Sequence, residues 1–317
     1  MKTVTITPLM SASGIDLSGD VQIGEDMSGL EPEPKDDWMY LGLRTIHDIA
    51  TEKGAAIRSA AGIGSGNGIM EIAMLKQLTA LKTLYVTDIL ERILPAIRKN
   101  IGRVISQRAS DVSITYVAGA DCDPLTQPVD LIYGNLPLIM TDPASLEQTL
   151  ATTTLTDSSR YLSLSTGEND ALLRWSMLSQ LGFLLSAKKH LNLGGSIVTL
   201  LGGRVPYEII TETFARAGLR FKERYCAFKV QADPQFLRDY ADYERTHGVE
   251  FCFYDYAAAS AIIKRERRIT VPDVIPLKGD ELKMLIKTAR LNAADAYAYA
   301  LQEKAVGHLA FAFEAFQ

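Results

Sequence analysis

The most informative stretch of the sequence is a run of alternating glycines, GIGSGNG at residues 62–68, between an expected strand and an expected helix. Glycine permits a sharp backbone turn and a close ligand approach that a Cβ would block. The next helix presents free N–H groups and its positive dipole end at the same point. The spacing misses the Gly-x-Gly-x-x-Gly pattern of dinucleotide sites, because the sixth position is Asn67 or Ile69. The run predicts a ligand-binding bend that disfavours nicotinamide cofactors, and a purely structural turn is the alternative.

Three polar side chains follow the next three expected strands. Asp88 closes LYVT, Asp121 follows the third strand, and Asn135 follows the fourth. Parallel strands end at one edge of a sheet, so Asp88 is expected beside the glycine bend, where a carboxylate can accept hydrogen bonds from ribose hydroxyls. The alternative is that Asp88 only caps the following helix. Asp123 is the alternative to Asp121 as the functional acid after the third strand.

The order and spacing of these motifs, with the turn at residues 188–196, resemble class I S-adenosylmethionine-dependent methyltransferases over residues 55–254. The resemblance implies S-adenosyl-L-methionine as cofactor and Asp121 or Asp123 as the partner of the adenine amino group. The cofactor-binding residues that it implies are Gly62, Gly64, Gly66, Asp88, Ile89, Asp121, Cys122 and Asn135.

The sequence after the fourth strand, Tyr133-Gly-Asn135-Leu-Pro-Leu, resembles the Asp/Asn-Pro-Pro-aromatic motif of methyltransferases that modify planar nitrogens. In that motif the side-chain carbonyl orients the nucleophilic N–H. The resemblance implies Asn135 and Tyr133 as catalytic residues. Leu136 and Leu138 replace the first proline and the aromatic ring, which argues against a flat acceptor stacked at this point.

A second departure is Ala60, which stands where the family has an acid for the ammonium of the cofactor. Glu71, Asp88 or a residue of a lid is expected to replace it. Alternatively the amine is neutral and attacks its own γ-carbon, which resembles azetidine-2-carboxylate synthases and releases methylthioadenosine. We therefore predict a methyltransferase acting on a nitrogen or oxygen of a small molecule, with a cofactor cyclase or a non-catalytic cofactor-binding protein as alternatives.

The elements that must position these residues follow an α/β pattern, in which short apolar runs alternate with amphipathic helices. This pattern predicts a doubly wound, mostly parallel, seven-stranded sheet of the methyltransferase-like Rossmann type, with an antiparallel edge. The expected strands are 55–61, 84–87, 114–118, 129–133, 196–201, 221–230 and 249–254. The expected helices are 38–52, one starting at 69, 91–106, 168–192, 207–217, 234–246 and two after residue 280.

The chain is expected to divide into three parts. Residues 1–54 form a flexible acidic arm and helical lid. Within them, residues 11–37 carry many acids and little apolar periodicity, so a disordered leader is the alternative for that segment. Residues 55–278 form the cofactor-binding domain. Residues 279–317 form C-terminal helices with Leu309, Phe313 and Phe316 on one face, which cover the sheet or make a dimer interface.

Composition limits the other partners. The formal net charge of −5 gives no general basic field for a phosphate backbone, so no nucleic acid is expected. No apolar run approaches a membrane span, and the start of the chain has no secretory pattern, so a cytoplasmic protein is expected. The four histidines show no metal-ligand spacing, and neither a metal nor a catalytic histidine is predicted. A small molecule is the expected substrate and a homodimer remains open.

Overall fold

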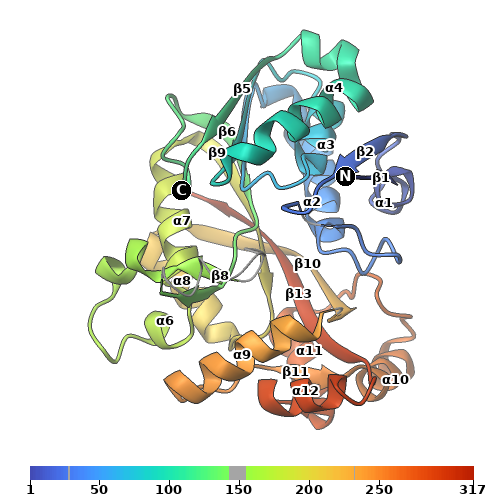
Figure 1. Cartoon of the computed structure of the whole chain (residues 1–317), viewed down its shortest axis with the longest axis vertical. Helices are drawn as coiled ribbons and strands as arrows, with labels where there is room; N and C mark the ends of the chain where they lie inside the picture. The colour runs from blue at the N-terminus through green and yellow to red at the C-terminus, as the bar shows by residue number, and fades with distance from the viewer. Residues whose placement is uncertain (28, 143–154, 232) are drawn as a thin grey trace.

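The computed structural model in Figure 1 describes residues 1–27, 29–142, 155–231 and 233–317. The strands are β1 (Lys2–Thr5), β2 (Asp20–Ile23), β3 (Ser59–Ile63), β4 (Thr83–Asp88), β5 (Ser113–Ala118), β6 (Val129–Gly134), β7 (Ile139–Thr141), β8 (Leu155–Asp157), β9 (Leu191–Gly202), β10 (Arg220–Val230), β11 (Phe253–Asp255), β12 (Arg290–Leu291) and β13 (Val306–Phe316).

The α-helices are α1 (Thr7–Ala12), α2 (Met39–Lys53), α3 (Ile69–Gln77), α4 (Leu94–Ser110), α6 (Ala171–Arg174), α7 (Leu178–Lys189), α8 (Tyr207–Ala217), α9 (Pro234–His247), α10 (Tyr256–Arg267), α11 (Gly279–Leu285) and α12 (Ala293–Ala300). Short 3-10 helices are η1 (Gly54–Ala56), η2 (Glu91–Ile93), η3 (Ser158–Arg160), η4 (Leu162–Leu164) and η5 (Lys287–Ala289). No helix in the described ranges is long and apolar enough to cross a membrane.

The central sheet has the expected doubly wound topology. Seven strands lie in the order β5-β4-β3-β6-β9-β13-β10, and β3 pairs in parallel with both β4 and β6. The chain therefore winds outward from β3 to β5 and then returns across β3 to β6. A ligand crevice forms outside the carboxyl ends of the strands at such a reversal. β5, β4, β3, β6 and β9 pair in parallel, and β13 is antiparallel to both of its long neighbours, β9 and β10. The predicted mostly parallel α/β fold is therefore confirmed.

The sheet is larger than the seven strands expected. Two short strands, β11 and β12, extend it, because β11 pairs with the first two residues of β13 and β12 pairs with β11. Nine strands result. The expected strand at 249–254 is confirmed only at its end, since β11 begins at Phe253.

Two hydrophobic layers cover the two faces of the sheet. Side chains alternate along a strand, so Ala61 and Ile132 join one layer while Ala60 and Leu131 join the other. Helices α7 and α8 pack in the first layer, and α2, α3 and α4 pack in the second, on the opposite side of the sheet (Figure 1).

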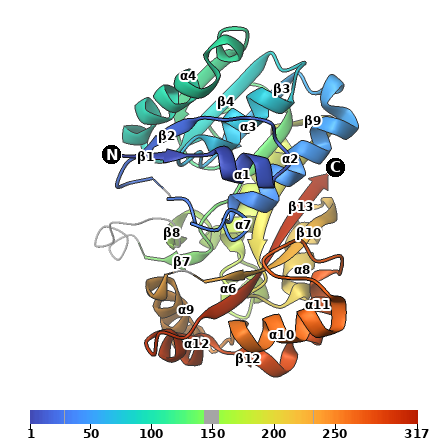
Figure 2. The ribbon, with the colours of Figure 1, turned by 90° about the vertical axis from the view of Figure 1, so that its right-hand side faces the viewer.

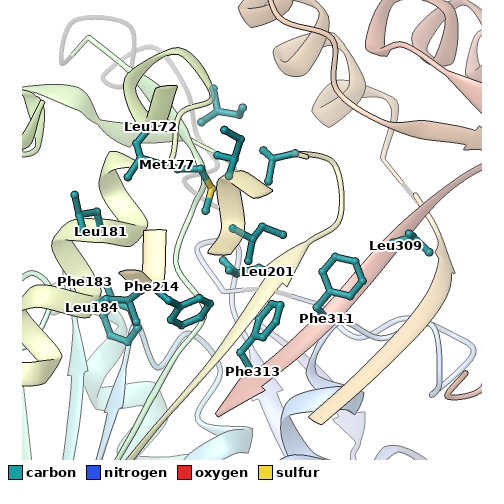
Figure 3. Packing of buried hydrophobic residues seen from close by; sticks show 14 of the residues in the cluster. Leu172, Met177, Leu181, Phe183, Leu184, Leu201, Phe214, Leu309, Phe311 and Phe313 are labelled. Atoms are coloured by element: carbon teal, nitrogen blue, oxygen red, sulfur yellow. The ribbon is translucent and has the colours of Figure 1, made fainter. Parts of the chain in front are cut away.

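The end of the chain is a strand, and the expectation of C-terminal helices alone is wrong there. Helices α11 and α12 are present, but β13 then enters the sheet between β9 and β10. Leu309, Phe311 and Phe313 alternate with small residues and are fully buried with Leu201 and other residues of the first layer (Figure 3). The spacing of Leu309, Phe313 and Phe316 fits one face of a helix. Leu309, Phe311 and Phe313 also occupy every second position, as in a strand, and the strand is the structure observed. Leu309 and Phe313 thus offer no surface for a dimer.

The N-terminal arm contains regular structure, and within residues 11–37 this is the end of α1 and the strand β2. β1 and β2 form an antiparallel pair around α1, close to α2 and α4 (Figure 2). The Asn100 side chain of α4 accepts from the Gln22 N–H (2.7 Å) and donates to the Gln22 carbonyl (2.9 Å). Tertiary hydrogen bonds therefore order a segment that has too few apolar residues to signal its own packing.

The single helix expected at 168–192 is divided in two. Asp170 accepts from the Leu172 N–H (2.9 Å) and caps α6, which ends at Arg174. Ser176 then takes a left-handed backbone (φ +59°), and its hydroxyl donates to the Leu138 carbonyl (2.9 Å) while accepting from the Met140 N–H (2.7 Å). The break therefore holds the chain that follows β6.

Phe313→Ala tests the placement of β13. Removing a fully buried ring from between the sheet and α8 should lower the free energy of unfolding by about 3–5 kcal/mol. Leu193→Ala, at a side chain that is 95% exposed, should change it by less than about 0.5 kcal/mol. Urea unfolding followed by circular dichroism measures both, and equal effects would contradict the assignment.

Candidate functional site

A cavity of about 620 Å³ lies where the topology predicts a crevice. It is lined by the glycine bend after β3, the ends of β4, β6 and β9, the start of β13 and part of the N-terminal arm. Its volume is within the roughly 300–1,000 Å³ of small-molecule sites. The expected site residues that line it are Gly64, Gly66, Asp88, Ile89, Asp121, Tyr133 and Asn135.

The glycine bend has the backbone that its sequence predicts. Gly64, Gly66 and Gly68 have φ values of +67°, +56° and +81°, in the left-handed region that favours glycine. A Cβ on Gly64 would lie 2.9 Å from the Leu136 side chain. The Ser65 N–H donates to the Thr87 carbonyl (2.8 Å), which ties the bend to the end of β4.

Asp88 joins the bend to the next strand. Its Oδ2 accepts from the Gly66 N–H (3.0 Å), and its Oδ1 accepts from the Leu90 N–H (2.9 Å). Burial raises the pKa of this carboxyl above its ordinary value. Each carboxylate oxygen has two acceptor sites, so acceptor capacity toward the cavity remains. Ile89, which is 56% exposed, follows it on the cavity wall.

The structure distinguishes Asp121 from Asp123. Asp121 lines the cavity with a left-handed backbone (φ +46°) and accepts from the Tyr161 hydroxyl (3.2 Å). Burial raises its pKa to about 6, and the charge of Asp123 adds to the shift. Asp123 is exposed and does not line the cavity. Cys122 does not line it either, because its side chain is fully buried and its N–H donates to the Ser186 hydroxyl (3.2 Å).

Gly62 has a packing role and does not line the cavity. It lies inside β3, and a Cβ there would be 1.8 Å from Oε1 of Glu71. Glu71 is fully buried on α3, and neither of its carboxylate oxygens has a hydrogen-bond partner of ordinary geometry among the described residues. Burial raises its pKa to about 7, and the nearby Asp88 adds to the shift. The first glycine of the motif therefore makes room for an acid against the cavity.

Tyr133 and Asn135 lie at the end of β6, on the same wall. The Tyr133 hydroxyl is buried without a partner among the described residues, beside Gly42 of α2. Burial, with the charge of Glu71, raises the pKa of Tyr133 well above its ordinary value. The phenol therefore keeps its proton at neutral pH and is available to donate a hydrogen bond. Asn135 is half-buried on the cavity wall.

Unsatisfied polar atoms gather at this cavity. Buried polar atoms in folded proteins are usually hydrogen-bonded, and each exception requires an explanation. Apart from the Thr199 hydroxyl, every such atom found in the described part of the chain belongs to a residue that lines the cavity: Glu71, Tyr133, Gln180, Arg204 and His308. A ligand or ordered water in the cavity would supply the missing partners.

A buried lysine fixes the N-terminal arm on the cavity wall. Lys229 of β10 donates from Nζ to the carbonyls of Lys35 (2.8 Å) and Asp37 (2.5 Å). Burial lowers its pKa to about 8 in spite of the acids nearby. Arm residues Glu31 and Asp36 line the cavity as a result.

The polar cavity residues that the sequence did not predict as site residues include Tyr161, Gln180, Arg204, Lys229 and His308. Glu71 was named only as a substitute for the acid missing at Ala60. His308 could have been placed by the period-two alternation in Val306–Phe316, which indicates a strand ending at the same sheet edge. Nothing in the local sequence signals the other four. No group of three metal-ligating side chains occurs among the described residues.

Comparisons with known proteins find similarity to solved structures alone. No family model and no curated protein matches the chain. Among solved structures it is similar to a ribosomal protein L11 methylase from Lactobacillus delbrueckii subsp. bulgaricus, with 16% identity over 56% of this chain and 71% of that chain (TM-score 0.35). It is also similar to the glycopeptide N-methyltransferase MtfA complexed with sinefungin, with 15% identity over 51% of this chain and 50% of that one (TM-score 0.32). A third is StiE O-MT residues 942–1257, with 12% identity over 86% and 74% (TM-score 0.40).

Glu71→Gln tests the buried acid. Because the folded-state pKa of about 7 exceeds the ordinary 4.5, the native state binds the proton more tightly than the unfolded chain. Stability of the wild type relative to Glu71→Gln should therefore fall by about 3 kcal/mol as pH rises from 4.5 to 8. Urea unfolding at several pH values measures it. The exposed Glu91→Gln is the control, and parallel profiles for wild type and Glu71→Gln would contradict the assignment.

Proposed function

We propose that this protein binds S-adenosyl-L-methionine in the cavity and transfers its methyl group to a nitrogen or oxygen of a small molecule. The observation that carries the proposal is the Gly66–Asp88 hydrogen bond (3.0 Å), since it puts a glycine bend and a strand-end carboxylate side by side on one cavity wall. A nucleoside ribose is bound by this combination of a bend and an acid in doubly wound folds.

The residues present fit the parts of this compound. Asp88 has acceptor sites left for ribose hydroxyls, and Asp121 offers a carboxylate for the adenine amino group. Glu71 offers an unpaired carboxylate for the ammonium, in place of the acid that is missing at Ala60. A cation beside Glu71 would return the pKa of that acid toward its ordinary range, because an opposite charge favours the ionised form.

The main contribution of the protein to this reaction would be to align the cofactor with the acceptor. The sulfonium supplies an electrophilic methyl carbon, and an acceptor lone pair displaces the sulfur in line. Holding both reactants in that geometry can supply about 7–11 kcal/mol of the barrier. The Asn135 carbonyl would orient the acceptor N–H or O–H, and the protonated Tyr133 phenol would donate a hydrogen bond on the same wall.

Asp88→Asn tests cofactor binding. Losing the charge that accepts the Gly66 N–H and the ribose hydroxyls should raise the Kd of S-adenosylhomocysteine about 10- to 100-fold. Asp123→Asn removes an equal charge from an exposed carboxyl outside the cavity and should leave the Kd unchanged. Titration calorimetry measures both. If the wild type binds neither this compound nor S-adenosyl-L-methionine, the proposed function is wrong.

One observation supports a second candidate, in which the cofactor itself is cyclised. Ala60 is fully buried where the family has an acid, so no carboxylate at that position favours the charged form of the cofactor amine, and the unpaired Glu71 carboxylate is available to accept its proton. The free amine would attack its own γ-carbon, forming the C–N bond as the C–S bond breaks. Azetidine-2-carboxylate and methylthioadenosine are the products, and one proton is released.

Product analysis separates the candidates. Methyl transfer should give S-adenosylhomocysteine only when an acceptor is added, whereas cyclisation should give methylthioadenosine from the cofactor alone. Unchanged cofactor with every acceptor would favour a non-catalytic binding protein.

Asn135→Ala should lower kcat by about 100-fold or more with less than a threefold change in cofactor Kd, if the amide orients the nucleophile. Mass spectrometry and calorimetry measure these quantities, and equal losses of kcat and affinity would contradict the role.

A further inference from the structure

The cavity has a second polar end, built by strands that lie far from the glycine bend in the sheet. Arg204 follows β9, Lys229 is near the end of β10, and His308 is in β13 directly opposite Lys229 in the ladder. All three line the cavity together with Gln231. The antiparallel insertion of β13 brings its start to the edge where β9 and β10 end.

Arg204 is a cation without a counter-ion. Among the residues that the structure describes, no carboxylate is within ion-pair distance of its guanidinium. It donates instead to the neutral Gln231 amide oxygen (2.6 Å), and its Nε is buried without an acceptor. The rings of Tyr240 and Phe253 lie 5.1 Å and 5.7 Å from its Cζ. Stacking fixes the guanidinium while its Nε–H remains without an acceptor and its charge without a counter-ion.

His308 adds a neutral group beside this charge. Burial lowers its pKa well below the ordinary value, and the charges of Arg204 and Lys229 act in the same direction. The Nδ1 atom has no hydrogen-bond partner in the described part of the chain. A neutral imidazole can donate one N–H, so His308 can complement an oxygen acceptor held by Arg204.

The acids at this end are already engaged elsewhere. Asp36 accepts from the Val230 N–H (3.1 Å), and Asp233 accepts from the Gln235 N–H (2.7 Å) as the cap of α9. Lys229 donates to the carbonyls of the arm, and its charge interacts with those of Asp37, Asp36 and Glu31. The unmatched charge at this end of the cavity therefore belongs to Arg204.

Apolar side chains line the cavity together with Arg204 and His308. Phe236, Tyr240, Phe311 and Leu200 line the same cavity. We propose that this end binds the acceptor substrate and that the acceptor is a small apolar molecule carrying a carboxylate, which Arg204 binds in bidentate fashion with a hydrogen bond from His308. The assignment of this ligand as the acceptor rests on the proposed function. A planar carboxylate matches the fork of a guanidinium, and apolar walls keep the pair dry.

The test uses matched probes. Benzoate, phenylacetate and hexanoate, each with its primary amide, are titrated into the protein with and without saturating S-adenosylhomocysteine, and binding is followed by ligand-observed NMR. At least one carboxylate should bind at least about tenfold more tightly than its amide. Arg204→Met should abolish that preference. Arg160→Met is the matched control, because Arg160 is an exposed arginine at the Asp121 end of the cavity, and it should retain the preference.

A second variant keeps the test decisive if Arg204→Met fails to fold. Gln231→Glu preserves the contact with Arg204 but supplies the missing carboxylate, so it should remove the preference for carboxylates while S-adenosylhomocysteine still binds. Equal binding of carboxylates and amides to the wild type, or a preference that survives Gln231→Glu, would overturn the proposal. Failure of S-adenosylhomocysteine to bind would instead overturn the proposed function, and the carboxylate comparison can still be made without it.

Discussion

The hydrogen bond from the Gly66 N–H to the Asp88 carboxylate is the contact on which the site depends. It joins the bend after β3 to the end of β4, and therefore fixes the cavity wall at the point where the strand order reverses. The left-handed backbone of the bend makes the N–H available, and burial of Asp88 strengthens the attraction by excluding water. With this contact in place, the helix α3 begins at the cavity and brings Glu71 under the first glycine.

The two ends of the cavity carry opposite unmatched groups. Glu71 is an acid with no cationic partner, and Arg204 is a cation with no acidic partner among the described residues. Leaving buried polar groups unpaired costs about 1–3 kcal/mol each, so the empty protein gives up stability at both ends. An amino acid moiety near Glu71 and a carboxylate near Arg204 would recover that energy on binding. The distribution of these groups is the reason for proposing that the cavity holds two ligands.

The sequence predicted those elements in which local pattern and tertiary environment agree. The helix at 207–217 was predicted at its observed bounds, because an amphipathic pattern ends at Gly218 with its left-handed backbone. The glycine bend, Asp88, Asp121 and Asn135 also reach the cavity wall as expected. The predictions failed where one pattern fits two periods, as in β13, and where a side chain interrupts a continuous pattern, as Ser176 does between α6 and α7. Cys122 was placed by resemblance alone, and its contact with Ser186 could not be seen in the sequence.

The sequence by itself determined the doubly wound sheet and the bend-and-acid pair, because both arise from residues that are close in the chain and have strong local preferences. Only the tertiary structure decided that Gly62 makes room for Glu71, that Lys229 holds the arm, and that Arg204 and His308 share one cavity. Lys35 and Lys229 are 194 residues apart, and Arg204 and His308 are 104 residues apart, so their proximity depends on strand pairing that local sequence does not encode. Gly62 and Glu71 are only nine residues apart, but their contact depends on how α3 packs against β3. Burial, which sets their charges, is likewise a property of the packed fold.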